Sequence, residues 1–367
     1  MLQKLEKASV PTRQAKRPEG DRSGRALLLI GLLVVLLAVA ALASLMTGAS
    51  DAPAIKVLMA WAGLADRAEL RAADLLIMEA IRLPRIIMGI LIGASLAVSG
   101  AVMQGLFRNP LADPGLVGVS AGASLGAVTM IVLGGTSFLA PFMAVASTYA
   151  LPFAAFLGGL ASTLLLYRVA TRQGRTSVAT MLLAGIALGA FAGAATGILV
   201  YLANDAQLRE LTFWGLGSLA GATWAKIGSA APIILLALAA TPFLARALNA
   251  LALGESAAHH MGIPVQRMKN IAIVTVAAAT GAAVAVSGGI GFVGIVVPHL
   301  LRLIIGPDHR YLLPAAGLLG ATFLIGADAI ARTIVAPAEL PIGIVTAFFG
   351  APFFLWILLR RRSILDL

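Results

Sequence analysis

Ten apolar stretches, each near the length of a membrane-spanning helix, follow one another along this sequence. A helix needs about 20 residues to cross the hydrocarbon core of a bilayer, and 60% of the 367 residues are hydrophobic whereas 12% are charged. We expect ten transmembrane helices, at residues 26–46, 84–104, 116–134, 150–168, 178–202, 229–248, 269–286, 291–305, 312–334 and 341–359. The expected fold is therefore all-α and polytopic, with both termini on the same side of the membrane.

The segments outside these stretches divide the chain into a tail and one membrane domain. Residues 1–25 are polar and basic and are predicted to form a cytosolic tail, and residues 26–367 the ten-helix domain. Residues 47–81 and 203–227 mix charged with apolar residues, which favours a location at the outer surface. Residues 41–43, Ala-Leu-Ala, resemble a signal-peptide cleavage site. The apolar run before them is longer than the roughly 7–15 residues of a signal-peptide core, so we expect an uncleaved first helix.

The net charge of +11 is unevenly distributed in this topology. With a cytosolic amino terminus, the inner segments hold most of the 27 lysines and arginines, and the outer segments hold Lys56, Arg67, Arg71, Arg82, Arg85, Arg209, Lys226 and Arg332. Such an excess of basic residues in cytosolic loops is the usual rule for membrane proteins. No basic patch is interleaved with aromatic residues, as nucleic-acid binding would need, so we expect no nucleic-acid partner. The sequence has no cysteine, which excludes disulfides and thiolate metal sites.

Residues 82–124 predict a helical hairpin that packs closely against other helices. A polar turn at 108–115 separates two apolar runs, and Pro110 and Pro114 interrupt helical hydrogen bonding there. The hairpin is rich in small residues, which let helix backbones approach each other in lipid. Part of it, Ala-Val-Ser-Gly at 97–100, recurs at 285–288. This recurrence favours inverted repeats, a common arrangement in transporters, although chance similarity in an apolar sequence would also produce it.

Several motifs together resemble the membrane permeases of type II binding-protein-dependent ABC importers for iron chelates, haem and cobalamin. They are RLPR (82–85), NPLADPG (109–115), LLAGIALG (182–189), LALGE (251–255), SGGIGFVGIVVPHLLR (287–302), DHRYLLP (308–314) and AELPIGIVTAFFGAPFF (338–354). The resemblance implies a homodimer of this chain in the bacterial inner membrane, with both termini cytosolic. It also implies two cytosolic ATP-binding subunits and a periplasmic substrate-binding protein as partners.

The chain contains no GxxxxGK[ST] phosphate-binding loop. It is therefore expected to have no ATPase activity and no cofactor of its own, and ATP and magnesium would bind to the partner subunit. Within the inner loop 249–267, residues 251–261 read as a short helix, stopped by Gly262 and Pro264. The resemblance implies that this segment is the coupling helix held by the ATPase subunit. Its predicted residues are Leu253, Gly254, Glu255, Ser256, Ala257, Ala258, His259, His260, Met261 and Gly262.

Three arginines, Arg82, Arg85 and Arg332, fall at the outer ends of predicted spans. They could anchor helices by extending to the interface, or capture acidic residues of a docking protein by charge-assisted pairing. The resemblance implies the second role, with docking of the periplasmic binding protein. Asp328 lies within a span, one turn before Arg332. We expect mutual neutralisation of this pair, and proton coupling is the alternative.

The resemblance also implies gate and pathway positions. Asn109 and Leu111 match the cytosolic gate of these permeases, and Ser177 and Val178 match a second gate layer more loosely. Glycine recurs at every fourth position of the fifth span, at Gly185, Gly189, Gly193 and Gly197. This gives one smooth helix face, which either packs on a neighbouring helix or lines a wide pathway. In the resembling homodimers this face flanks the pathway at the two-fold axis.

No metal site is expected. His299 and His309 recur in the family pattern and are predicted to be structural, and His259 and His260 are adjacent in the presumed coupling helix. Successive helical residues point about 100° apart, so these two cannot hold one metal ion together. They are expected to be surface residues, and receipt of haem iron by one of them is the alternative.

Three classes of function compete for this sequence. A transport permease accounts for the topology, the charge distribution and the missing ATP-binding motif together. An intramembrane enzyme would need a second catalytic group beside Asp328, and an ion-driven carrier would need more than one buried carboxylate. Among possible cargoes, the outer segment 207–224 is most similar to haem permeases, which predicts haem as the substrate. Ferric siderophores and cobalamin are the alternatives.

Overall fold

The computed structural model describes residues 22–48, 53–66, 70–172 and 175–360. The ten expected spans all appear as helices, with bounds within a few residues of those predicted, and seven of them are long and apolar enough to cross a membrane. The ten are α1 (Ser23–Met46), α4 (Leu83–Phe107), α5 (Val119–Leu133), α7 (Ala150–Ala170), α8 (Val178–Leu202), α10 (Trp224–Ala252), α12 (Val265–Ser287), α13 (Val293–Ile305), α14 (His309–Thr333) and α15 (Ile342–Arg360). Most of the predicted tail, and residues 361–367, lie outside the described part of the chain.

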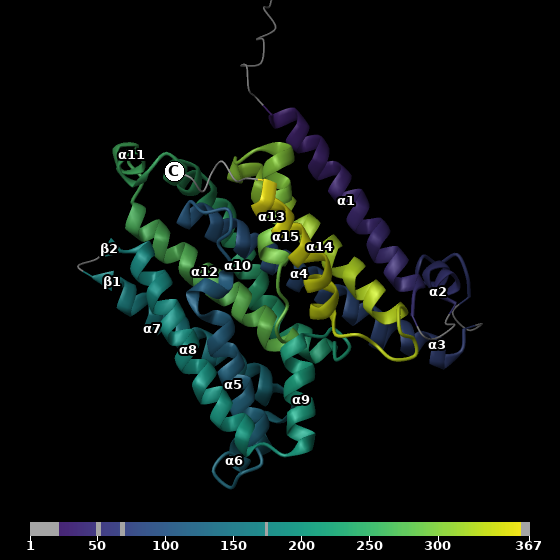
Figure 1. Ribbon diagram of the computed structural model, residues 1–367. Helices are drawn as coiled ribbons and strands as arrows, with labels where there is room; N and C mark the ends of the chain where they lie inside the picture. The colour runs from purple at the N-terminus through teal and green to yellow at the C-terminus, as the bar shows by residue number, and fades with distance from the viewer. Residues whose placement is uncertain (1–21, 49–52, 67–69, 173–174, 361–367) are drawn as a thin grey trace, which may run out of the picture.

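Short elements connect these spans. The outer segments contain α2 (Ala54–Trp61), α3 (Ala72–Leu76), α6 (Ala140–Ala146) and α9 (Asp205–Leu216), and a π-helical turn (Ile77–Arg82) leads into α4. The inner connections contain α11 (Glu255–His260) and a hairpin of two short strands, β1 (Thr171–Arg172) and β2 (Arg175–Thr176). Figure 1 shows α11 at the top of the molecule and α6 and α9 at the bottom. We call the end with α11 the inner end and the opposite end the outer end.

The hairpin predicted at 82–124 is formed by α4, a polar turn and α5. Pro84 lies in the first turn of α4, where its missing N–H costs no hydrogen bond. At the other end Arg108 adopts a left-handed conformation (φ 51°), which ends the helix. Pro114 then begins a 3-10 turn (Pro114–Val117) that leads into α5, and the side chain of Asp113 caps this turn by accepting from the N–H of Gly115. The polar turn lies where it was predicted, and Pro110 and Pro114 both fall between the end of α4 and the start of α5.

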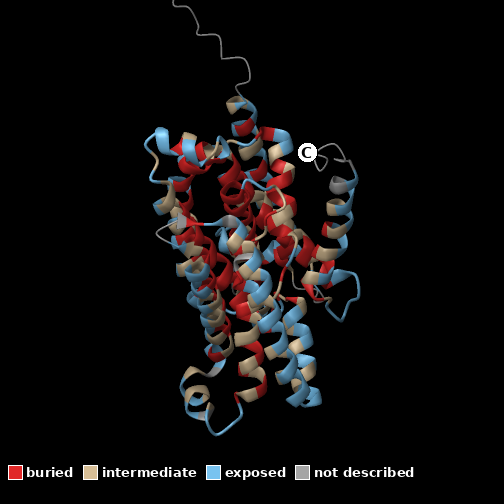
Figure 2. Cartoon of the chain, turned by 60° about the vertical axis from the view of Figure 1, so that its left-hand side comes forward, coloured by how far each residue is buried: buried red, intermediate tan, exposed pale blue. Residues whose placement is uncertain are grey.

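The centre of the bundle is formed by α4 and α12. In each of them, 78% of the 18-residue apolar stretch that could cross the membrane is buried. Figure 2 shows buried residues concentrated in the middle of the molecule and exposed ones around its outside. Glycine makes this packing possible. At Gly100 a Cβ atom would collide with the backbone of Gly294 in α13, and at Gly93 with the backbone of Gly320 in α14. These contacts confirm that the small residues of the hairpin bring helix backbones together.

Two helices lie at the periphery. Only 11% of the corresponding apolar stretch of α1 and 6% of that of α8 are buried, although both helices are strongly apolar. In water such surfaces would be unfavourable, but lipid or another subunit can cover them. Both helices therefore face the membrane or a partner over most of their surface.

The helix order supports inverted-repeat character. The central helices α4 and α12 run in opposite directions, from outer to inner end and from inner to outer end, and each precedes a short apolar helix, α5 or α13. The two copies of the Ala-Val-Ser-Gly tetrapeptide do not occupy equivalent positions in their helices, however. Residues 97–100 lie inside α4, whereas residues 285–288 include the end of α12. The repetition is therefore one of helix order and not of that motif.

Candidate functional site

The inner end carries α11, the segment predicted to be the coupling helix. It is shorter than expected, because α10 continues through Leu251 to Ala252 and α11 begins only at Glu255. Gly254 (φ 110°) separates the two helices, and Gly262 (φ 76°) follows α11, so glycine permits both turns. Within the segment Ala258 is fully buried, whereas Leu253, at its start, is 73% exposed. The segment thus presents an exposed apolar side chain at the inner surface.

The two histidines of α11 lie at the surface. The ring centroids of His259 and His260 lie 6.4 Å apart, and both residues are exposed. Within the described ranges, no group of three or more histidine, aspartate or glutamate side chains could hold a metal ion. The expectation that these are surface histidines is confirmed. A role in receiving haem iron stays a prediction.

The predicted gate residues lie at two polar turns of the inner end. The side chain of Asn109 accepts a hydrogen bond from the N–H of Leu111 at 2.9 Å, which shapes the turn after α4. Ser177 is the N-cap of α8, and its hydroxyl accepts from the N–H of Thr180 at 3.3 Å. Val178 is the first residue of that helix. The 3-10 turn that follows Leu111 contacts α8, the helix that Ser177 and Val178 begin. Their action as gates stays a prediction.

The glycine face of α8 is open. No atom lies within 4 Å of a Cβ placed at Gly189, Gly193 or Gly197, apart from the helix itself. Large apolar residues of the same helix, such as Ile186 and Phe191, are also strongly exposed. Within the described part of the chain, no other helix packs closely on these three glycines. This face is left to lipid, a pathway or a second subunit, and Gly185 belongs to the same predicted set.

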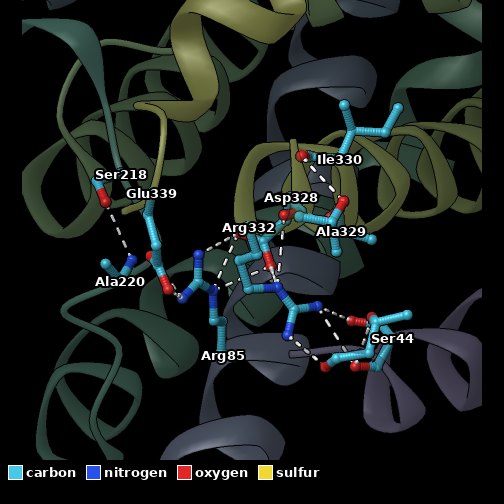
Figure 3. Close-up of polar contacts among 11 residues, drawn as sticks. Ser44, Arg85, Ser218, Ala220, Asp328, Ala329, Ile330, Arg332 and Glu339 are labelled. Carbon is cyan, nitrogen blue, oxygen red and sulfur yellow. Dashed lines mark hydrogen bonds and ion pairs between the residues drawn. The ribbon is translucent and has the colours of Figure 1, made fainter. Parts of the chain in front are cut away.

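A network of buried charges joins three helices at the outer end. Arg85 of α4 donates from Nε and Nη2 to the Asp328 carboxylate of α14, at 2.8 to 3.0 Å, and from Nη1 to the Glu339 carboxylate at 2.9 Å (Figure 3). Arg332 lies 3.1 Å from Asp328, on the same helix. The predicted neutralisation of Asp328 by Arg332 is confirmed. Arg85 is an additional partner, joined to it across 243 residues of sequence.

Arg332, together with Arg82, also holds the outer end of α1. Arg332 donates to the hydroxyl of Ser44 at 2.7 Å and to the carbonyl of Thr47 at 3.1 Å, and Arg82 donates to the carbonyl of Leu45 at 2.6 Å. The last carbonyls of a helix have no partner within it. The side chains of Arg82 and Arg332 therefore provide hydrogen-bond donors for carbonyl groups that the end of α1 leaves without a partner in the helix.

The burial of these arginines differs from the expectation of a ring open to a docking protein. Arg82, Arg85 and Arg332 are only 3%, 6% and 5% exposed. They lie at the outer ends of their helices, as predicted, but their guanidinium groups contact residues of this chain, because Asp328, Glu339 and the carbonyls of α1 lie within reach. Docking by these residues stays a prediction. The sequence analysis did not single out Glu339. Its position, an acidic residue beside the outer end of a predicted span, could have indicated it.

A second polar cluster forms where α10 meets α14 at the inner end. The side chain of Asn249 donates to Asp308 at 2.7 Å and accepts from the N–H of His309 at 2.9 Å. Asp308 caps α14, and burial would raise the pKa of its carboxyl, but hydrogen bonds from Arg310 and Asn249 outweigh burial and lower that pKa to about 2. His309 is buried and also contacts Asn249 through Nδ1 at 2.8 Å. This placement agrees with the structural role predicted for it.

Ten apolar helices, a charged cluster that joins three of them at the outer end and a short helix at the inner end with an exposed leucine before it are the architecture of a polytopic transport permease. Residues 36–360 match the model of the FecCD transport family. The chain belongs to that family, whose members are the permeases of type II binding-protein-dependent ABC importers.

Individual relatives carry different cargo names. The chain is 48% identical to the hemin transport system permease protein HmuU of Yersinia pestis, over 77% of this chain and 83% of that protein. It is 44% identical to the cobalamin import system permease protein BtuC of Halobacterium salinarum, over 78% of this chain and 74% of that protein. A solved structure of a metal-chelate type ABC transporter in an inward-facing conformation matches with a TM-score of 0.78 and 31% identity. That match covers 91% of this chain and 99% of the other.

Proposed function

We propose that this chain is the permease subunit of an ABC importer that carries haem across the bacterial inner membrane. Two copies would form the pathway, two separate cytosolic subunits would bind and hydrolyse ATP, and a periplasmic binding protein would deliver the haem. The observation that carries the cargo assignment is the 48% identity to a hemin permease, over most of both chains. The similarity of 44% to a cobalamin permease makes cobalamin the second candidate.

The inner end supports a role for α11 in contact with the ATPase. An exposed apolar side chain beside a short helix, with glycine turns on both sides, is a compact surface that a partner can grip. The open glycine face of α8 supports a dimer, because none of the described residues outside this helix packs on Gly189, Gly193 or Gly197. In the dimer, the turns at Asn109 and Ser177 would close the inner end of the pathway. Both termini would then be cytosolic.

The outer end supports docking of the binding protein. Arg82, Arg85 and Arg332 bring three guanidinium groups together beside the outer ends of α4 and α14, and Glu339 of the same network reaches the surface with a side chain 37% exposed. A protein with acidic residues on its docking surface would be attracted to such a group of cations. Replacing the arginines is a poor test, because they also hold α1 and α14. Glu339, whose side chain is 37% exposed, is the better residue to change.

Uptake into proteoliposomes tests the proposal. The vesicles would contain this chain with its ATPase subunit, and haem-loaded binding protein would be added outside with ATP inside. ATP-dependent accumulation of haem is the expected result. Accumulation of cobalamin or a ferric siderophore but not of haem, each with its own binding protein, would overturn the cargo and keep the importer. Solute movement without the ATPase subunit would instead indicate an ion-coupled carrier.

A further inference from the structure

A buried lysine joins α11 to the start of α8. Lys269, in the first turns of α12, extends its ammonium group to the Glu255 carboxylate of α11 at 2.7 Å. The same ammonium group donates to the backbone carbonyl of Thr176 at 3.3 Å. The side chain of Lys269 is 5% exposed, whereas that of Glu255 is 50% exposed. One side chain therefore contacts both the candidate coupling helix and the residue that precedes Ser177.

Thr176 is itself held from two further directions. Its N–H donates to the side-chain oxygen of Gln266 at 3.0 Å, and its hydroxyl accepts from the amide nitrogen of Gln266 at 2.6 Å. That hydroxyl also lies 2.9 Å from the hydroxyl of Thr171, across the β1–β2 hairpin. The amide nitrogen of Gln266 also donates to Asn270 at 2.8 Å. These contacts clamp the residue before the N-cap of α8 to the first turn of α12.

The energetics make this connection stiff. A buried ammonium group that loses its carboxylate partner is strongly unfavourable, because the charge stays desolvated without compensation. When α11 moves, Lys269 is therefore expected to follow Glu255 and not to release it. Thr176 is bonded to Lys269 and Gln266, so a displacement of α11 would reach the first turn of α8, where Ser177 and Val178 lie.

We propose that Lys269 is the positioning residue that transmits movement of α11 to the amino-terminal end of α8. This inference rests on the proposed function, in which α11 contacts the ATPase subunit and α8 flanks the pathway. It adds a specific connection between them, formed by Glu255, Lys269, Gln266 and Thr176. A purely structural role for Lys269 would affect the amount of folded protein but not the amount of haem moved for each ATP hydrolysed.

The test measures that ratio in proteoliposomes of the assembled importer. Lys269→Met is expected to lower the haem accumulated per ATP hydrolysed by about threefold to tenfold, the range typical of residues that modulate coupling. Glu255→Ala should lower it by a similar factor, and the double variant should lower it no further than either single one. The control is Arg267→Met, which removes an exposed cation two residues away and is expected to match the wild-type ratio.

A second measurement keeps the inference testable if Lys269→Met assembles poorly. The chain has no cysteine, so Ser177→Cys introduces one thiol whose labelling rate reports on the start of α8. ATP is expected to change that rate in an otherwise wild-type importer, and to change it much less when Glu255→Ala is added. An unchanged haem-to-ATP ratio in Lys269→Met, or an equal labelling response in Glu255→Ala, would overturn the inference. Failure of the wild-type importer to move any chelate would instead count against the proposed function.

Discussion

The buried charges at the outer end show how one residue can serve several helices. Asp328 compensates Arg85 and Arg332 at once, and Arg85 in turn holds Glu339 of the segment between α14 and α15. Three helices and one connecting segment therefore depend on a single carboxylate. Such networks are costly to break, because the groups left behind stay buried and charged.

Asp328→Asn is expected to destabilise the protein strongly. It leaves two buried arginines facing each other with one fewer carboxylate, and losing one partner of a buried pair typically costs about 3–5 kcal/mol. Glu339→Gln should cost much less, because Glu339 is partly exposed and Arg85 keeps its contacts with Asp328. Thermal unfolding of the purified protein in detergent would measure both. Equal stability of the two variants would contradict this ranking.

Glu339→Gln should also strengthen docking of the binding protein. Glu339 occupies Nη1 of Arg85, the position that an acidic residue of a docking protein would use. Removing this competitor is expected to lower the Kd by about threefold to tenfold, and to make docking more sensitive to salt. Glu210→Gln, on α9 at the same end, controls for the loss of one outer negative charge. Weaker or unchanged docking in Glu339→Gln would show that Glu339 does not compete.

Individual helices in this molecule are positioned by glycine contacts and by caps. Gly100 and Gly228 both lie inside helices, but a Cβ at Gly100 would meet the backbone of Gly294, whereas one at Gly228 would meet nothing. Gly100→Ala is expected to reduce the yield of folded protein sharply, because α4 and α13 must separate. Gly228→Ala should leave it unchanged or slightly higher, since alanine favours helix. Size-exclusion profiles of the two variants in detergent would compare them.

The cap of α14 predicts a dependence on pH. Asp308 has a pKa near 2 in the folded protein, below the value of about 3.9 for an unperturbed aspartate. Its contribution to stability is therefore present above about pH 4 and is lost as the pH falls toward 2. Asp308→Ala should remove this contribution, with a loss of about 1 kcal/mol at neutral pH from the missing cap. Unfolding curves at pH 7 and pH 3 would show the variant and the wild type converging at low pH.

Element by element, the sequence predicted the fold well and the contacts less well. Apolar length and proline positions located all ten spans and the turn at 108–115, because both effects are local. The start of α11 was wrong, since tertiary packing extends α10 to Ala252. The contacts of Arg85 could not be predicted, because they join residues 243 and 254 positions apart. The burial of Arg82, Arg85 and Arg332 could not be predicted either, because neither the local spacing of residues nor the composition indicates it.

For the whole molecule, the exposed α8 face is the surface that we expect a second copy of the chain to cover. We expect Gly193→Cys to form a disulfide-linked dimer on mild oxidation in membranes, because the two copies of α8 would lie near the two-fold axis. Leu28→Cys, on the strongly exposed side of α1, is the control that should stay monomeric. Denaturing gels without reductant would detect the linked form. Cross-linking at position 28 but not at 193 would place the dimer interface elsewhere.

The attachment of α1 has a consequence for the order in which the protein assembles. This helix is translated well before α14, yet it packs chiefly against α14, and its terminal carbonyls are held in part by Arg332 of that helix. Until α14 has been synthesised and inserted, α1 must wait in the lipid with those carbonyls incompletely satisfied. A helix translated late thus fastens one translated early, and a chain truncated before α14 would leave α1 without its main packing partner.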